Sequence, residues 1–325
     1  MGTGHRMTGT FTRGLLAGAA GTTALNAVTH LDMALRGRPA STVPQQTVDA
    51  LADVTGQQVP GRGAVREARL GGLGALAGIV NGVGLGVLSS VARSAGVRMP
   101  FPVGTVVKGA LSMAATDAPV AALGVSDPRG WSRQDWLTDA VPHLAYGATV
   151  QAVVSGLPTA EERVLPRQKA RAGLVARSLL LGVAAGGRSS LGLAGPTLTA
   201  ADTGVAKKLA SLTSLGGELY ADKQPGVPDR TSPAALPARL ASGAGGAVLL
   251  ARRQGANAAW PVVAGLAGSA AGSFGGLGWR RWADGRVPDW QAGVIEDGVA
   301  LVLALAACLP GRRRSTRVRT VRLFD

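Results

Sequence analysis

Long apolar stretches alternate with short charged ones along most of this chain. The clearest stretch is residues 71–92, which hold 22 residues without a charged side chain. As a helix rising about 1.5 Å per residue, it would cross the roughly 30 Å hydrocarbon core of a bilayer. Similar stretches cover residues 14–31, 103–124, 136–157, 172–195, 236–251, 257–279 and 290–309. The pattern predicts about eight membrane-spanning helices, and seven to nine are compatible with it.

Three segments need separate interpretation. Residues 47–54 place Val48, Leu51 and Val54 at helical spacing, which predicts a short amphipathic helix at the membrane interface. Residues 205–221 predict a helix that enters the bilayer only in part. Residues 14–31 follow a basic start, as in a signal peptide, but threonines and an asparagine interrupt them. We expect this stretch to be retained as the first span, with a cleaved signal as the alternative.

Composition favours a membrane protein over other classes. Glycine supplies 48 of the 325 residues, about twice its average share of about 7 %. Aromatic residues make up 4 % and charged residues 16 %. A soluble core is hard to pack without aromatic side chains, and a disordered chain would carry more charge. The fold we expect is all-α, a polytopic transmembrane helical bundle packed through glycine and alanine.

Glycines recur at four-residue spacing in two of the expected spans. Residues 74, 78, 82 and 86 form one series, and residues 268, 272 and 276 form another. Side chains four residues apart share a helix face, so each series predicts a stripe where a neighbouring helix approaches closely. A homo-oligomer stays open.

The formal net charge is +15. The basic residues lie mostly in short clusters between the apolar stretches. This is typical of loops that flank membrane spans, where Lys and Arg collect on the cytoplasmic side. We expect the plasma membrane as the location, both termini in the cytoplasm, and anionic lipid headgroups as partner of the basic tail, 312–325. Nucleic acid is the less favoured partner.

The charged segment 161–171 is the best boundary between two halves. It separates an N-terminal four-helix membrane unit, 1–160, from a C-terminal four-helix membrane unit, 172–311, which precedes the tail. One cysteine, Cys308, and three scattered histidines offer no metal-ligand spacing. We expect no cofactor and no enzymatic activity, because no nucleophile, base and orienting group stand together.

Ionisable residues inside the expected spans are the candidate functional groups, because each costs about 2.5–3.5 kcal/mol to insert. In the second half they predict a substrate- or ion-binding site made of the following residues: Arg188, Glu218, Asp222, Glu296 and Asp297. The alternative is a closed charge network that only holds helices together.

Asp139 and His143 stand four apart, on one helix face, and predict a proton-coupling pair. An ordinary polar contact between helices is the alternative. Lys108 and Asp117 fall on opposite faces of one helix, so each is expected to need a partner from another helix, unless Lys108 extends to the interface.

Several short motifs resemble those of known membrane proteins. In the second half they are Gly187-Arg188-Ser189, the Glu-x-x-x-Asp-Lys-x-Pro element at 218–225, and the glycine-rich span 257–279. In the first half they are residues 17–22, 32–33, 36–39 and 142–147. The chain resembles uncharacterised multi-pass integral membrane proteins of GC-rich actinobacteria, and its second half a small bacterial membrane-protein family of unknown function. The resemblance implies a plasma-membrane location and brings no activity with it.

Two classes of function therefore stay open. The first is a small-solute or ion permease, in which the charged residues of the second half line a polar site. The second is a non-transporting scaffold or assembly partner, whose buried charges only fix how the helices pack.

Overall fold

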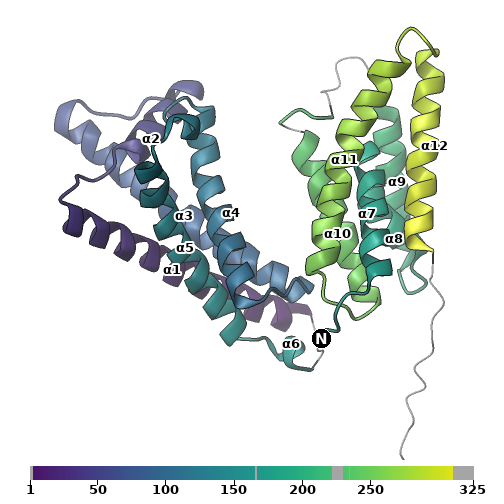
Figure 1. The fold of residues 1–325 in the computed structure, drawn as a ribbon, viewed down its shortest axis with the longest axis horizontal. Helices are drawn as coiled ribbons and strands as arrows, with labels where there is room; N and C mark the ends of the chain where they lie inside the picture. Colours follow the sequence, from purple (N-terminus) through teal and green to yellow (C-terminus); the bar gives the residue numbers. More distant parts are fainter. Residues whose placement is uncertain (1–2, 165–166, 222–229, 234, 310–325) are drawn as a thin grey trace, which may run out of the picture. The chain divides into compact units, whose positions relative to one another are not determined.

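A computed structural model describes residues 3–164, 167–221, 230–233 and 235–309 of the chain (Figure 1). Within these ranges every element of regular structure is a helix, so the expected all-α class is confirmed. The chain forms two compact units, unit 1 (Met1–Pro166) and unit 2 (Arg167–Asp325). Their boundary falls within the segment 161–171. That each unit crosses a membrane four times stays a prediction.

Unit 1 contains four long helices, α1 (Thr3–Arg36), α3 (Gly63–Ala95), α4 (Phe101–Ala122) and α5 (Arg133–Gly156). The shorter elements are α2 (Val43–Val54), the 3-10 helix η1 (Pro128–Gly130) and α6 (Ala160–Val164). Helix α1 packs on both α3 and α5, and α4 lies alongside α5 (Figure 1). That the first apolar stretch is retained stays a prediction.

Local sequence explains where the unit 1 helices begin and end. Ser132 precedes α5, and its hydroxyl accepts a hydrogen bond from the backbone N–H of Asp135, while the Asp135 carboxylate accepts one from the N–H of Ser132. This reciprocal capping satisfies two of the N–H groups that a helix start leaves without partners. Helix α3 stops at Gly96, whose φ of 112° lies in a region that only glycine adopts readily.

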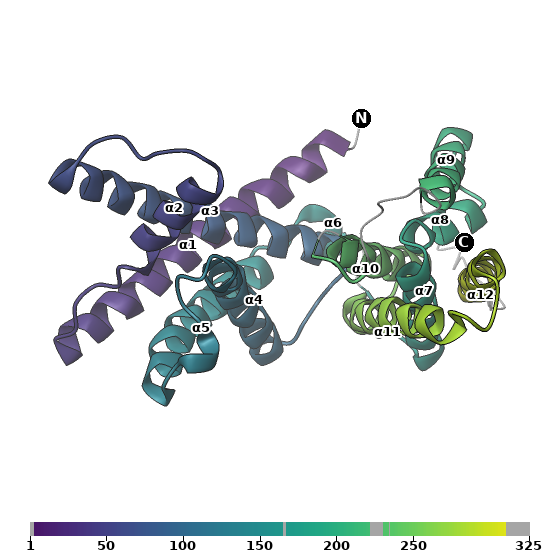
Figure 2. The same cartoon turned by 90° about the horizontal axis from the view of Figure 1, so that it is seen from above.

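Unit 2 contains α7 (Ala172–Gly187), α8 (Leu191–Thr199), α9 (Val205–Ala221), α10 (Ala235–Arg253), α11 (Ala259–Ala283) and α12 (Asp289–Cys308). Helix α7 is central, because α10, α11 and α12 all pack against it. Figure 2 shows the unit turned by 90°, with α9 at its edge beside α8.

The segment 172–195 is not one continuous helix, and that expectation was wrong. Helix α7 ends at Gly187, and α8 begins only at Leu191. Arg188 between them has extended backbone angles, φ −135° and ψ 108°. The pair Gly186-Gly187 explains the interruption, since glycine is a poor helix former and lets other chains approach closely.

Glycines form the contacts between helices in both units. A Cβ added at Gly86 of α3 would collide with Gly18 of α1, and one added at Gly272 of α11 would collide with backbone of Val183 in α7. Gly268 packs on α7 in the same way, as the predicted stripe requires. Gly78 departs from its stripe, because nothing described lies within 4 Å of its missing Cβ.

Two of the described helices, α3 and α12, are long and apolar enough to cross a membrane. Helix α7 is apolar but has only 16 residues. The described helices thus establish two candidate spans, and the count of eight is not established by length and composition.

Candidate functional site

The interruption between α7 and α8 brings charged side chains into the interior of unit 2. Arg188, which is 5 % exposed, donates from Nε to Oδ1 of Asp297 in α12 at 2.6 Å. Its Nη2 lies 2.5 Å from the same oxygen. Gly186, two residues earlier, packs on Ser269, Gly272 and Ser273, near the middle of α11. The pair Arg188–Asp297 therefore lies at the interruption and inside α12, rather than at the ends of α11 or α12.

Glu296, the neighbour of Asp297, accepts from two further arginines. Arg230 makes a bidentate contact with its carboxylate, and Nε of Arg280 donates to Oε2 at 3.2 Å. Gly276 makes room for this contact, because a Cβ there would collide with the Arg230 guanidinium. Three of the predicted site residues, Arg188, Glu296 and Asp297, thus belong to ion pairs between α12 and other segments of unit 2.

The two ends of the interrupted helix are each met by a side chain of opposite polarity. At the end of α7, Nη1 of Arg239 donates to the carbonyl oxygens of Gly186 and Gly187, at 2.9 Å each. At the start of α8, the Glu218 carboxylate accepts from Ser189 and Ser190. A helix carries partial negative charge at its C-terminus and partial positive charge at its N-terminus, so both contacts are favourable.

The predicted partnership of Glu218 with Asp222 has no test, since Asp222 lies outside the described residues. Sequence reasoning missed three arginines that complete the cluster, Arg230, Arg239 and Arg280. Arg239 lies near the start of α10, yet it is only 7 % exposed. The available sequence signal was that Arg239 is a charged residue inside the expected span 236–251. Nothing local in the sequence pairs Arg230 with Glu296, 66 residues later.

Unit 1 brings Asp139 and His143 together as their spacing predicts. Nδ1 of His143 lies 2.8 Å from the backbone oxygen of Asp139 and 3.5 Å from its Oδ2. Asp117 of α4 interacts directly with Asp139 of α5, so two carboxyl groups and an imidazole meet between these helices. The role of Asp139 and His143 in proton coupling stays a prediction.

Lys108 is buried and does not reach out to an interface. Its Nζ donates to Oε1 of Gln151 in α5 at 2.5 Å, and only 7 % of the residue is exposed. Lys108 and Asp117 therefore both find partners on α5, which agrees with the expectation that each needs another helix.

A second polar cluster of unit 1 was not foreseen. Arg13 of α1 donates from Nη1 and Nη2 to the two oxygens of Glu162 in α6, at 3.0 and 2.9 Å. It also donates to Ser90, Ser94 and the carbonyl of Leu157. Arg93 adds a hydrogen bond to Glu162 at 3.1 Å. Glu162 of the expected charged linker is thus buried in unit 1, while its neighbours Glu161 and Arg163 are exposed.

The charge state of Glu162 follows from these contacts. Burial alone would raise the pKa of its carboxyl group, but hydrogen bonds and the positive charge from Arg13, with further help from Arg93, lower it overall. The carboxylate therefore stays ionised at neutral pH and pairs with two arginines.

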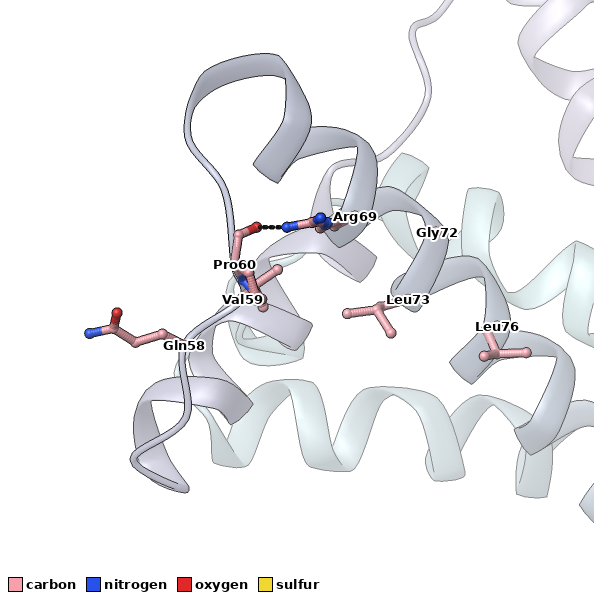
Figure 3. A pocket seen from close by; sticks show the side chains of 7 residues that line it. All are labelled: Gln58, Val59, Pro60, Arg69, Gly72, Leu73 and Leu76. Carbon is pink, nitrogen blue, oxygen red and sulfur yellow. Dashed lines mark hydrogen bonds between the residues drawn. The ribbon is translucent and has the colours of Figure 1, made fainter.

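Two shallow hollows lie on the surface of unit 1, away from these clusters. One, of about 490 Å³, lies between the segment 58–60 and the start of α3, where Leu73 and Leu76 line it (Figure 3). Arg69 closes one side and donates to the carbonyl of Pro60 at 2.7 Å. The other, of about 470 Å³, lies between the ends of α1 and α5. Neither hollow includes a predicted site residue.

The described residues group no three His, Cys, Asp or Glu side chains in a way that would hold a metal ion. Comparisons with protein-family models, with curated proteins and with solved structures find no match for this chain. Its function must therefore be inferred from its own residues.

Proposed function

We propose that this chain is a multi-pass plasma-membrane protein and that unit 2 is the core of a small-solute or ion permease. The proposed spans are α1, α3, α4 and α5 in unit 1, and α7 with α8, α10, α11 and α12 in unit 2. Both termini would lie in the cytoplasm. The basic tail, 312–325, lies outside the described residues, and its contact with anionic lipid headgroups belongs to the proposal.

The distribution of apolar side chains supports a lipid environment. Only 17 % of the apolar window of α3 and 33 % of that of α12 is buried. Leu76, Val80 and Leu88 of α3 all expose more than half of their surface. The contacts between helices are made mainly by glycine, alanine and serine, with arginines and carboxylates among them and with a smaller set of large apolar side chains such as Tyr146, Val150 and Leu181. A water-soluble bundle has the opposite arrangement, with large apolar side chains inside.

The interrupted helix α7–α8 is the observation that carries the permease proposal. In a bilayer, irregular backbone is tolerated only where protein buries it or where it lines an aqueous cavity. Transporters use such interruptions, with polar groups at the ends of the half-helices, to bind solutes near the middle of the membrane. Here the interruption faces the middle of α11, and Arg188, Arg239 and Glu218 surround it.

A second candidate function is a membrane scaffold, and a different observation favours it. Arg188 is paired with Asp297, and Glu296 is paired with Arg230 and Arg280. Paired charges are what a network that only fixes helix positions would show. A scaffold has no need of an interrupted helix, however, and for that reason we place the permease first.

Flux through proteoliposomes tests the two candidates. We expect Arg188→Ala and Glu218→Gln to abolish uptake of the transported ion or solute while the protein still inserts and stays monodisperse. Matched controls are Arg281→Ala and Asp202→Asn, because both side chains are exposed. Loss of folding in the two site variants would support the scaffold, as would wild-type protein that moves none of a broad panel of ions and small solutes.

Proton coupling by Asp139 and His143 has its own test. If these residues carry the proton, Asp139→Asn should leave downhill flux in place and remove its dependence on a pH gradient. Asp53→Asn is the matched control, since Asp53 is exposed in α2. A variant that still accumulates solute with the pH gradient would show that the pair is only a contact between helices.

A further inference from the structure

Helix α9 is attached to unit 2 differently from the other long helices. None of its residues is buried, and of the described elements it packs chiefly on α8. Four apolar side chains on it are largely exposed, namely Val205, Leu209, Leu212 and Tyr220. Few apolar contacts therefore hold α9 in place, which is typical of a segment that opens at low free-energy cost.

Glu218 supplies the main polar attachment. Its Oε1 accepts from the backbone N–H of Ser189 at 2.6 Å and from the Ser189 hydroxyl at 2.7 Å, and its Oε2 accepts from the N–H of Ser190 at 2.8 Å. The Ser190 N–H is one of the donors that the start of α8 leaves without a partner inside the helix, and the Ser189 N–H belongs to the interruption just before it. A carboxylate from α9 thus occupies a position that suits any small anion with two or three oxygens.

One hydrogen-bond donor beside this position, Nε of Arg239, is not used by Glu218. Arg239 is more than nine-tenths buried at the interruption, where it holds the carbonyls of Gly186 and Gly187, yet its Nε has no hydrogen-bond partner among the described residues. Glu218 is the carboxylate whose charge acts most strongly on Arg239. A buried guanidinium with an unused donor is costly unless something else binds there.

We propose that α9 is a lid, that Glu218 latches it to the start of α8, and that a small carboxylate or phosphate anion takes the place of Glu218 when the lid opens. The anion would accept from the backbone N–H groups of Ser189 and Ser190 and gain the unused Nε donor of Arg239. The proposal names small anions as the substrate class of the proposed permease. Transport of the anion rests on that proposed function, whereas binding of the anion does not.

Thiol labelling of α9 in purified full-length protein tests the latch without measuring transport. Leu215→Cys introduces a half-buried thiol on α9, in a Cys308→Ala background that removes the one natural cysteine. We expect Glu218→Gln to raise the rate of maleimide labelling about tenfold or more, since it removes a charge-assisted set of hydrogen bonds. Asp202→Asn, which changes an exposed carboxylate just before α9, should leave the rate unchanged.

The anion is tested in the same protein with Glu218 intact. Sodium phosphate or sodium succinate should raise the labelling rate over sodium chloride at equal ionic strength, and Arg239→Gln should remove this effect. A faster rate in phosphatidylglycerol than in phosphatidylcholine nanodiscs, without added anion, would identify the phosphate as a lipid headgroup instead.

Two outcomes would overturn the proposal. Unchanged labelling in Glu218→Gln would show that α9 is not latched by this carboxylate, and labelling indifferent to every anion and lipid would show that nothing replaces it. Failure of transport has a separate signature, because flux can be absent from proteoliposomes while the labelling responses remain.

Discussion

Both units bury arginines among closely packed helices, but they place them differently. In unit 1 the Arg13–Glu162 cluster joins the last turns of α3, the end of α5 and the short α6, so it lies where helices terminate. In unit 2 the charges surround an interruption that faces the middle of α11. The ion pair of unit 1 holds helix ends together. The charges of unit 2 also form hydrogen bonds with backbone N–H and C=O groups that have no partner inside the interrupted helix.

This difference predicts different losses on substitution. Variants of the Arg13–Glu162 cluster in unit 1 should lose stability, because this cluster joins helices. Unit 2 variants at Arg188 or Glu218 should lose transport before they lose the fold. The following predictions test each side of that contrast, beginning with the largest expected effect.

Arg13→Ala is expected to destabilise unit 1 most. It would leave Glu162, whose side chain is 5 % exposed, with an uncompensated charge, and such losses cost about 3–5 kcal/mol. Arg93 still reaches Glu162, so the lower end of that range is expected. Thermal unfolding in detergent measures the loss. The double variant Arg13→Met with Glu162→Gln should recover most of it, and an Arg13→Ala protein as stable as wild type would contradict the structure.

Gly272→Ala in unit 2 is expected to cost about 1–3 kcal/mol, because its Cβ would collide with backbone of Val183 and force the two helices apart. Gly275→Ala is the matched control three residues later, since nothing described lies within 4 Å of the added Cβ. That control should gain about 0.5–1 kcal/mol from helix propensity.

The same pair of changes exists in unit 1 and sharpens the contrast. Gly86→Ala would collide with Gly18, and Gly84→Ala meets open space. If Gly86→Ala and Gly272→Ala reduce the melting temperature alike, the two units share one mode of helix packing. They would then differ only in where they place charge.

Gly276→Ala should have a smaller effect, about 1 kcal/mol, because its Cβ meets the movable end of Arg230 rather than backbone. The displaced guanidinium would lose part of its contact with Glu296. Thermal unfolding of Gly276→Ala beside Gly278→Ala, an open position on the same helix, measures the difference. An equal loss in both variants would show that the Arg230 contact contributes nothing.

Much of the helical layout was readable from the sequence. Apolar stretches such as 103–124 and 136–157 appear as α4 and α5, because a predominantly apolar run flanked by Pro, Gly or capping Ser fixes a helix and its ends almost locally. The i, i+4 contact of Asp139 with His143 was predictable for the same reason. The sequence allowed an interruption at Arg188 through Gly186 and Gly187 but could not fix it, because many other glycines of this chain lie inside continuous helices.

The partners of the buried charges were the least predictable part. Arg13 meets Glu162 across 149 residues, and Arg188 meets Asp297 across 109. Which charges meet depends on helix positions that tertiary packing sets, and a basic residue flanking a span has the same local signature whether it faces water or a carboxylate. Glu162, for example, lies in the charged segment 161–171, where no local pattern distinguishes a buried carboxylate from an exposed one.

The smallest expected effect is the pH dependence of unit 1. Since the pKa of Glu162 is lowered in the folded state, its pairing stabilises the protein fully above its ordinary pKa of about 4.5, and the contribution is lost as the pH falls below that value. The difference in melting temperature between wild type and Glu162→Gln should therefore be constant near neutral pH and shrink between about pH 5 and pH 3. A difference that grows on acidification would mean that Glu162 is protonated in the folded state, and the contrast between the two units would then lose its unit 1 side.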